Sequence, residues 1–196
     1  DLQWSGGILS TCGLDNVGSH CDDGITYPTH GRISATPAKR FGVQAQWAEE
    51  DYILRAEGEM EQTRLYGVRM SLQRSIQTTL YGKSIQIHDR LTNGDAEDAP
   101  SFLLYHCNFG YPLLDSCAKV LMSEALVEPL NAISDDPAHM LPPIDGRGEE
   151  LYLCHARGTR GIALLHNPSL ELACYVAFDT AALPRFLKRR SEEHTS

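Results

Sequence analysis

Two histidines stand in sequence contexts that suit acid–base or ligand-binding chemistry. The first, His30, is followed by Gly31 and Arg32, after a loop rich in Gly, Asp and Pro and before a clear strand pattern. A glycine beside a histidine lets backbone or ligand approach the imidazole, which exchanges protons near neutral pH. The alternative is structural, with His30 capping a turn and Arg32 paired with a surface acid. The spacing leaves both interpretations open.

The second histidine, His106, lies at the end of an otherwise apolar strand. Strand alternation puts His106 and Asn108 on one face, and Tyr105 and Cys107 on the other. An unpaired buried polar group costs about 1–3 kcal/mol, so the imidazole and the amide must both find partners. Two polar groups on one face of a core strand are what a small polar ligand needs. The alternative is a histidine satisfied within the core.

Other patterns of reactive residues are weak or missing. The acids and hydroxyls of the opening segment lack the D-x-D-x-D-G spacing of a calcium loop, and we predict no metal site there. That group comprises Thr11, Asp15, Asn16, His20, Asp22 and Asp23. The sequence contains no G-x-S-x-G elbow, Walker phosphate loop or G-x-G-x-x-G fingerprint. Four further histidines are interpreted as structural, namely His88, His139, His155 and His166.

Composition limits the classes of partner. The 196 residues include 17 Lys and Arg against 26 Asp and Glu, a net charge of −9. This acidic balance argues against a nucleic-acid binder, which needs a basic face. No apolar run approaches the roughly 18–20 residues that span a bilayer, so no membrane association is predicted. The six cysteines show no C-x-x-C and the start shows no export signal, which predicts reduced thiols in a cytoplasmic protein.

The dominant hydrophobic period is two, which predicts an all-β fold, most simply an antiparallel β-sandwich. Alternating runs separated by turn residues predict a meander of antiparallel strands over residues 41–92. The apolar run at 101–108 predicts a central strand, and 151–156, 161–166 and 170–178 predict further strands. The Pro-rich stretch 124–148 is interpreted as a long excursion, and 180–190 as a short helix.

The two ends suggest an incomplete domain. The chain begins with Asp1 and enters at once into a Gly-rich apolar stretch, and the polar residues 191–196 show no apolar period. We expect a single β-sandwich domain over residues 1–190, incomplete at both ends, and a non-native or disordered tail over 191–196.

With both histidine phrases in view, the chain resembles the aldose 1-epimerase (galactose mutarotase-like) superfamily, and most closely its uncharacterised branch. The shared phrases are T-C-G-L-D-N-V-G at 11–18, H-G-R-I-S at 30–34 and L-Y-H-x-N-F-G-Y-P-L-L-D at 104–115. The last phrase is specific, because its mix of aromatics with His and Asn rarely arises by chance. The resemblance covers residues 6–188 and implies a large β-supersandwich, here partial.

The resemblance also implies roles for individual residues. In mutarotases one histidine protonates the sugar ring oxygen, and His106 occupies the comparable place. A second histidine, followed by glycine, helps to bind the sugar and polarise that oxygen, and His30 matches it. Sugar hydroxyls and the sugar face would be contacted by Arg32, Asn108 and Tyr111. No cofactor or metal is required. The family's glutamate base, which lies near its C-terminus, has no matching residue in this sequence.

The function implied is that of a carbohydrate-binding, aldose 1-epimerase-like protein that interconverts sugar anomers by acid–base ring opening when full length. Without the glutamate base, this chain is expected to be inactive as an isomerase. Tyr105, rather than Asn, precedes His106, so the hydrogen bond that orients the acid need not be the family's. Two alternatives remain open: a non-catalytic carbohydrate-binding module on the same fold, and a β-sandwich interaction domain with structural histidines. The expected partner is a small sugar, with the oligomeric state left open.

Overall fold

The computed structural model describes residues 7–22, 24–65, 67–123, 125–131, 138 and 149–190. These residues form antiparallel sheets and contain no α-helix, and so none long and apolar enough to cross a membrane. The predicted all-β class is confirmed. The chain divides into two compact units, Asp1–Asn108 and Phe109–Ser196, each described below by itself. The single domain over residues 1–190 stays a prediction, and the tail at 191–196 lies outside the described residues.

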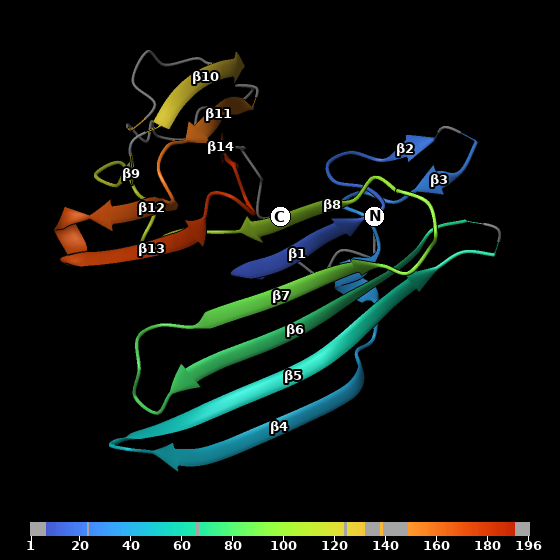
Figure 1. Cartoon of the computed structure of the whole chain (residues 1–196). Helices are drawn as coiled ribbons and strands as arrows, with labels where there is room; N and C mark the ends of the chain where they lie inside the picture. Colours follow the sequence, from blue (N-terminus) through green and yellow to red (C-terminus); the bar gives the residue numbers. More distant parts are fainter. Residues whose placement is uncertain are drawn as a thin grey trace. The chain divides into compact units, whose positions relative to one another are not determined.

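The first unit is built around an antiparallel meander. Its described elements are β1 (Leu9–Leu14), β2 (Cys21–Asp22), β3 (Thr26–Tyr27), the 3-10 helix η1 (Ile33–Ala35), β4 (Lys39–Ala48), β5 (Asp51–Thr63), β6 (Arg69–Thr79), β7 (Gln86–Asn93) and β8 (Phe102–Cys107). Strands β4, β5, β6 and β7 lie side by side in sequence order (Figure 1). The short loops between them suit antiparallel neighbours, since a parallel crossover needs about a dozen residues. The meander predicted over 41–92 is therefore confirmed.

One face of this meander carries the hydrophobic core of the first unit. The register places Met60 opposite Leu72, and Leu72 opposite Leu91, in one row across three strands. Leu14 of β1 and Leu103 of β8 belong to the same packed cluster. Full burial of a leucine side chain stabilises by about 1.5–3 kcal/mol. This cluster holds β1 and β8 against the meander.

Strand β8 pairs antiparallel with β1, with Ser10 opposite His106 and Thr11 opposite Tyr105. Because successive side chains alternate, Tyr105 and His106 lie on opposite faces. The Tyr105 hydroxyl reaches Asp89 of β7, so Tyr105 lies on the face toward the meander and His106 on the other. The central position predicted for 101–108 is wrong among the described residues, because β8 pairs with β1 in a two-stranded sheet.

The second unit contains two three-stranded antiparallel sheets among its described residues. Its elements are β9 (Lys119–Met122), β10 (Ala125–Asn131), β11 (Glu150–Ala156), β12 (Arg160–Asn167), the 3-10 helix η2 (Pro168–Leu170), β13 (Leu172–Asp179) and β14 (Arg185–Arg190). One sheet has the order β10-β11-β14 and the other the order β13-β12-β9 (Figure 1). All of these pairings are antiparallel, as the period-two patterns predict.

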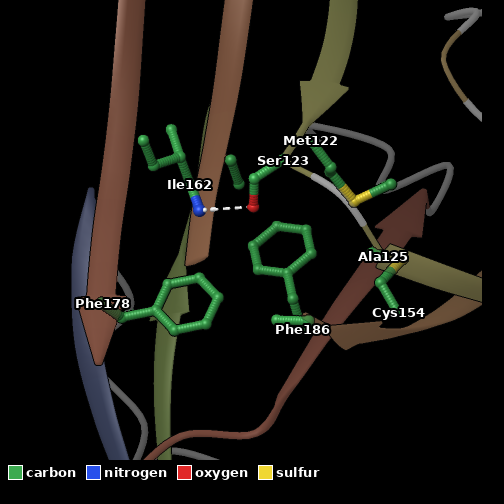
Figure 2. Close-up of a pocket in the computed structure, with 9 residues that line it drawn as sticks. Met122, Ser123, Ala125, Cys154, Ile162, Phe178 and Phe186 are labelled. Atoms are coloured by element: carbon green, nitrogen blue, oxygen red, sulfur yellow. Dashed lines mark hydrogen bonds between the residues drawn. The ribbon is translucent and has the colours of Figure 1, made fainter. Parts of the chain in front are cut away.

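A small apolar cavity is lined by residues from both sheets of this unit (Figure 2). Phe178 and Phe186 stack there, with ring centroids 6.4 Å apart and 9° between the planes. The Ile162 N–H donates to the Ser123 hydroxyl at 3.0 Å, which satisfies the polar group that Ser123 brings into the lining. The rest of the lining is apolar or a thiol, from Met122, Ala125, Cys154, Ala156 and Ala163. The cavity is part of the packed interior and does not suit a polyhydroxylated ligand.

Two predictions for the second unit are corrected. The helix predicted over 180–190 is wrong, because residues 185–190 form β14 and pair with β11, Leu187 opposite Leu153. Phe186 faces the cavity, and this tertiary packing outweighs local helix propensity. The excursion predicted at 124–148 begins with a strand, β10. Its residues 132–137 and 139–148 lie outside the described residues.

None of the six cysteines forms a disulfide: Cys12, Cys21, Cys107, Cys117, Cys154 and Cys174. Burial raises the pKa of the Cys12 thiol to about 11 and also raises the pKa of Cys154. Both thiols therefore stay protonated near neutral pH and pack as small hydrophobic groups.

Gly161 provides a test of packing in the second unit, because it lies opposite Phe178 in the β12–β13 pair. A Cβ added at Gly161 would lie 2.3 Å from the Phe178 ring, which is already stacked on Phe186. We expect Gly161→Ala to lower the free energy of unfolding by about 1–3 kcal/mol through overpacking. Chemical denaturation followed by circular dichroism measures the change. The control is Gly110→Ala, where an added Cβ meets nothing within 4 Å, and equal losses in both variants would contradict the prediction.

Candidate functional site

His30 lies in a tight turn whose backbone is hydrogen-bonded on both sides. Its N–H donates to the Gly18 carbonyl at 2.8 Å, and its carbonyl accepts from the Gly13 N–H at 3.0 Å. Its φ of 60° is in the left-handed region, which a non-glycine residue adopts only where the surroundings enforce it. The loop after β1 supplies these surroundings. It thereby fixes the backbone position from which the His30 side chain extends.

The same loop is tied down by a side chain and by a close backbone approach. The Asn16 amide donates to the carbonyls of Ser19 and Pro28, each at 3.0 Å. Gly31 forms an isolated parallel bridge with Gly13. The sequence therefore folds into a compact turn here, because glycine and asparagine together allow and satisfy it.

A backbone amide also contacts the His30 ring. The Gly18 N–H donates to Nδ1 of His30 at 3.3 Å. A ring nitrogen that accepts a hydrogen bond carries no proton, so the neutral ring bears its hydrogen on Nε2. This tautomer follows from the hydrogen-bond geometry. In this state His30 is a hydrogen-bond donor through Nε2.

The structure brings His30 and His106 together. Their ring centroids lie 5.2 Å apart, with an edge-on angle of 72° between the planes. His30 is 8% exposed, and His106, on the face of β8 away from the meander, is half-buried. Two imidazoles from distant parts of the sequence therefore share one location, and such a pair can donate, accept or transfer protons.

The other predicted binding residues are placed differently. The Arg32 guanidinium contacts Asp15 at 2.5 Å and its side chain is 41% exposed. The Asn108 amide donates to the Gly7 carbonyl at 2.6 Å, and the Asn108 N–H donates to the Ile8 carbonyl at 3.0 Å. Asn108 thus holds the start of β1. Tyr111 is 88% exposed and belongs to the second unit, so its place beside the histidines stays a prediction.

A buried polar group that the sequence patterns did not predict contacts the opposite face of β8. Asp89 receives a bidentate pair from Arg74, at 2.8 and 2.6 Å, and the Tyr105 hydroxyl at 2.5 Å. Burial is the largest cause that raises the pKa of Tyr105, and the nearby Asp89 carboxylate raises it further. The pattern held a signal for this group, because Arg74 lies between Leu72 and Ile76 on the inward-facing side of β6.

Metal binding finds no support in the described part of the chain. No three His, Cys, Asp or Glu side chains gather there closely enough to hold a metal ion.

The fold of the chain is that of aldose 1-epimerase-like β-sandwiches. It is similar in structure to a protein from Klebsiella pneumoniae subsp. pneumoniae described as a putative aldose 1-epimerase, with a TM-score of 0.82 and 22% sequence identity. The match covers 92% of this chain and 49% of that chain, so this chain spans about half the length of the protein it matches. At this identity the likeness shows the fold alone.

The chain belongs to the family described as "Domain of unknown function (DUF4432)", which matches residues 2–195. The predicted membership of a family described only as a domain of unknown function is thereby confirmed. None of the curated proteins matches the chain.

Gly31 tests whether the loop positions His30. Its φ is 73°, and an added Cβ would lie 2.3 Å from the Gly13 carbonyl oxygen and 2.5 Å from that of Asn16. Because both are backbone atoms, the loop itself must move. We expect Gly31→Ala to cost about 1–3 kcal/mol of stability and to separate the two imidazoles. The loss of ring-to-ring NOEs between His30 and His106 measures the separation.

The matched control for this test is Gly24→Ala. Gly24 also has a positive φ, 92°, but an added Cβ there meets nothing within 4 Å. It carries the conformational penalty without the collision. Unchanged NOEs in folded Gly31→Ala would show that the loop does not set the position of His30.

Proposed function

We propose that this chain binds a monosaccharide at the His30–His106 pair and that the full-length protein interconverts sugar anomers as an aldose 1-epimerase-like isomerase. The observation that carries this proposal is the 5.2 Å separation of the two imidazoles. The fold shared with the Klebsiella pneumoniae protein supports it. The sugar is the proposed partner, with neither nucleic acid nor membrane involved.

The proposed reaction opens and recloses the sugar ring. His106 gives a proton to the ring oxygen while a base removes the proton of the C1 hydroxyl, the C1–ring oxygen bond breaks, and a carbonyl forms at C1. Rotation about the C1–C2 bond and reclosure, with the proton transfers reversed, give the other anomer. Histidine suits the acid because its reference pKa is near 6.5. His30 donates a hydrogen bond from Nε2 to the same ring oxygen.

The remaining proposed contacts involve polar groups around the pair. Arg32 keeps an exposed guanidinium edge while Asp15 holds it in place, which suits a sugar hydroxyl. The side-chain NH2 group of Asn108 donates to the Gly7 carbonyl. We propose that the side-chain carbonyl oxygen of Asn108 accepts from a second sugar hydroxyl. We propose that Tyr111 stacks on the sugar face, as its exposed ring permits.

The second candidate function is a non-catalytic carbohydrate-binding module. Two observations favour it for this chain: no residue matches the family's glutamate base, and His30 is largely buried with Nδ1 engaged. Binding and turnover are therefore separate questions. We expect the 196-residue chain to bind sugar and to show no anomer exchange above the buffer rate.

We also propose a cytoplasmic location. The support is that none of the six cysteines forms a disulfide, which suits a reducing compartment.

The histidine pair is tested by calorimetric titration of a monosaccharide panel against the wild type, His30→Ala and His106→Ala. We expect both variants to weaken binding of the best sugar by at least about tenfold, since a hydrogen bond to a polar ligand is worth about 0.5–1.5 kcal/mol and a lost partner costs more. His88→Ala is the matched control, because His88 is exposed on the other face of the meander. Absence of heat for every sugar would favour the interaction-domain alternative.

NMR magnetisation exchange between α and β anomers tests turnover on the same samples. Exchange above the buffer rate that disappears in His106→Ala would show that this chain contains its own base. It would contradict the expectation of binding without catalysis.

A further inference from the structure

We propose that Tyr105, anchored by Asp89 and Arg74, is a positioning residue for His106. This inference rests on the proposed function of His106 and adds to it the device that holds the imidazole in place. Tyr105 has no contact with the sugar in this proposal and acts through the backbone of β8.

Tyr105 is anchored by hydrogen bonds that join three side chains from three different strands. Arg74 of β6 donates Nε–H and Nη2–H to the two carboxylate oxygens of Asp89 on β7, at 2.8 and 2.6 Å. The Tyr105 hydroxyl of β8 donates to Oδ2 of Asp89 at 2.5 Å. The Arg74 guanidinium also lies 5.8 Å from the centroid of the Tyr105 ring. These hydrogen bonds between the three side chains therefore link β8 directly to the meander.

This link acts on His106 because the two residues are adjacent on one strand. Tyr105 faces the meander, and strand alternation then puts the His106 side chain on the opposite face. The position of β8 relative to the meander therefore sets the backbone position from which the His106 side chain extends. A strand held at Tyr105 cannot slide or twist locally without moving His106 relative to His30.

Energetics favours a positioning role over a stabilising one. The Asp89 side chain is 5% exposed and that of Arg74 18% exposed, so both charges are largely removed from water. Apolar residues of similar volume in place of a buried ion pair are often neutral or stabilising. Leu72 and Leu91, the pair next along the same face, belong to the core cluster and show that this face accepts apolar residues. A bidentate ion pair with a tyrosine hydroxyl supplies directionality that apolar packing lacks.

The Tyr105 hydroxyl is suited to donate a hydrogen bond near neutral pH. Burial raises the pKa of Tyr105, and the Asp89 carboxylate raises it further. The hydroxyl therefore stays protonated near neutral pH and can donate to Asp89.

The experiment removes the hydroxyl and observes the imidazole. In Tyr105→Phe, we expect the His106 ring signals in sugar-free protein to shift by NMR, while those of His88 on the polar face of β7 do not. We expect sugar affinity to fall roughly tenfold, since small displacements of a reacting group cost factors of this order or more. Tyr175→Phe, an exposed tyrosine of the second unit, is the matched control. Unchanged His106 signals in folded Tyr105→Phe would overturn the proposal.

A second variant covers failure of the first to fold. The double variant Arg74→Met/Asp89→Leu removes the acceptor of the Tyr105 hydroxyl without leaving a buried charge unpaired, so we expect the His106 signals to shift in this variant as well. No shift would again overturn the positioning role. If the wild type binds no sugar, the proposed function fails, yet the sugar-free ring signals still decide whether Tyr105 positions His106.

Discussion

Strand β1 is the element on which both histidines depend. Ser10 pairs with His106 across the β1–β8 ladder, and the N–H of Gly13 donates to the His30 carbonyl. Strand pairing has a side-chain period of two, so a slip by one residue would turn His106 toward the meander. Leu103 resists such a slip, because it shares a face of β8 with Tyr105 and would leave the core cluster. The residues that build the core therefore also fix where the two imidazoles meet.

Polar contacts inside the first unit add directional constraints to the packing of the apolar core. The Leu14 N–H donates to the buried side-chain oxygen of Gln62 at 3.3 Å, and Tyr105 donates to Asp89. Apolar packing gains free energy with little directional preference. Hydrogen bonds to buried acceptors weaken steeply when their angles change. The first unit thus uses hydrophobic burial for cohesion and a few buried polar contacts for the placement of β1 and β8.

Local pattern and long-range contact account for what the sequence could and could not predict. The meander was predictable because alternation and turn residues are local signals. The paired strand at 185–190 was misjudged as a helix because its partner β11 is remote in sequence. No strand was predicted for residues 9–14, since only pairing with β8 makes them a strand. The meeting of the histidines came from the family resemblance, because no spacing rule predicts a contact between distant loops and strands.

The geometry around His30 bears on how the proposed chemistry is divided between the two rings. Its Nδ1 accepts the Gly18 N–H, so adding a second proton to the ring would set two N–H groups against each other and break that bond. His30 is therefore suited to donate a hydrogen bond from Nε2 while remaining neutral. In the proposed reaction the proton that reaches the ring oxygen must then come from His106. This division agrees with the roles that the family resemblance implies, and it follows here from one backbone amide of the loop after β1.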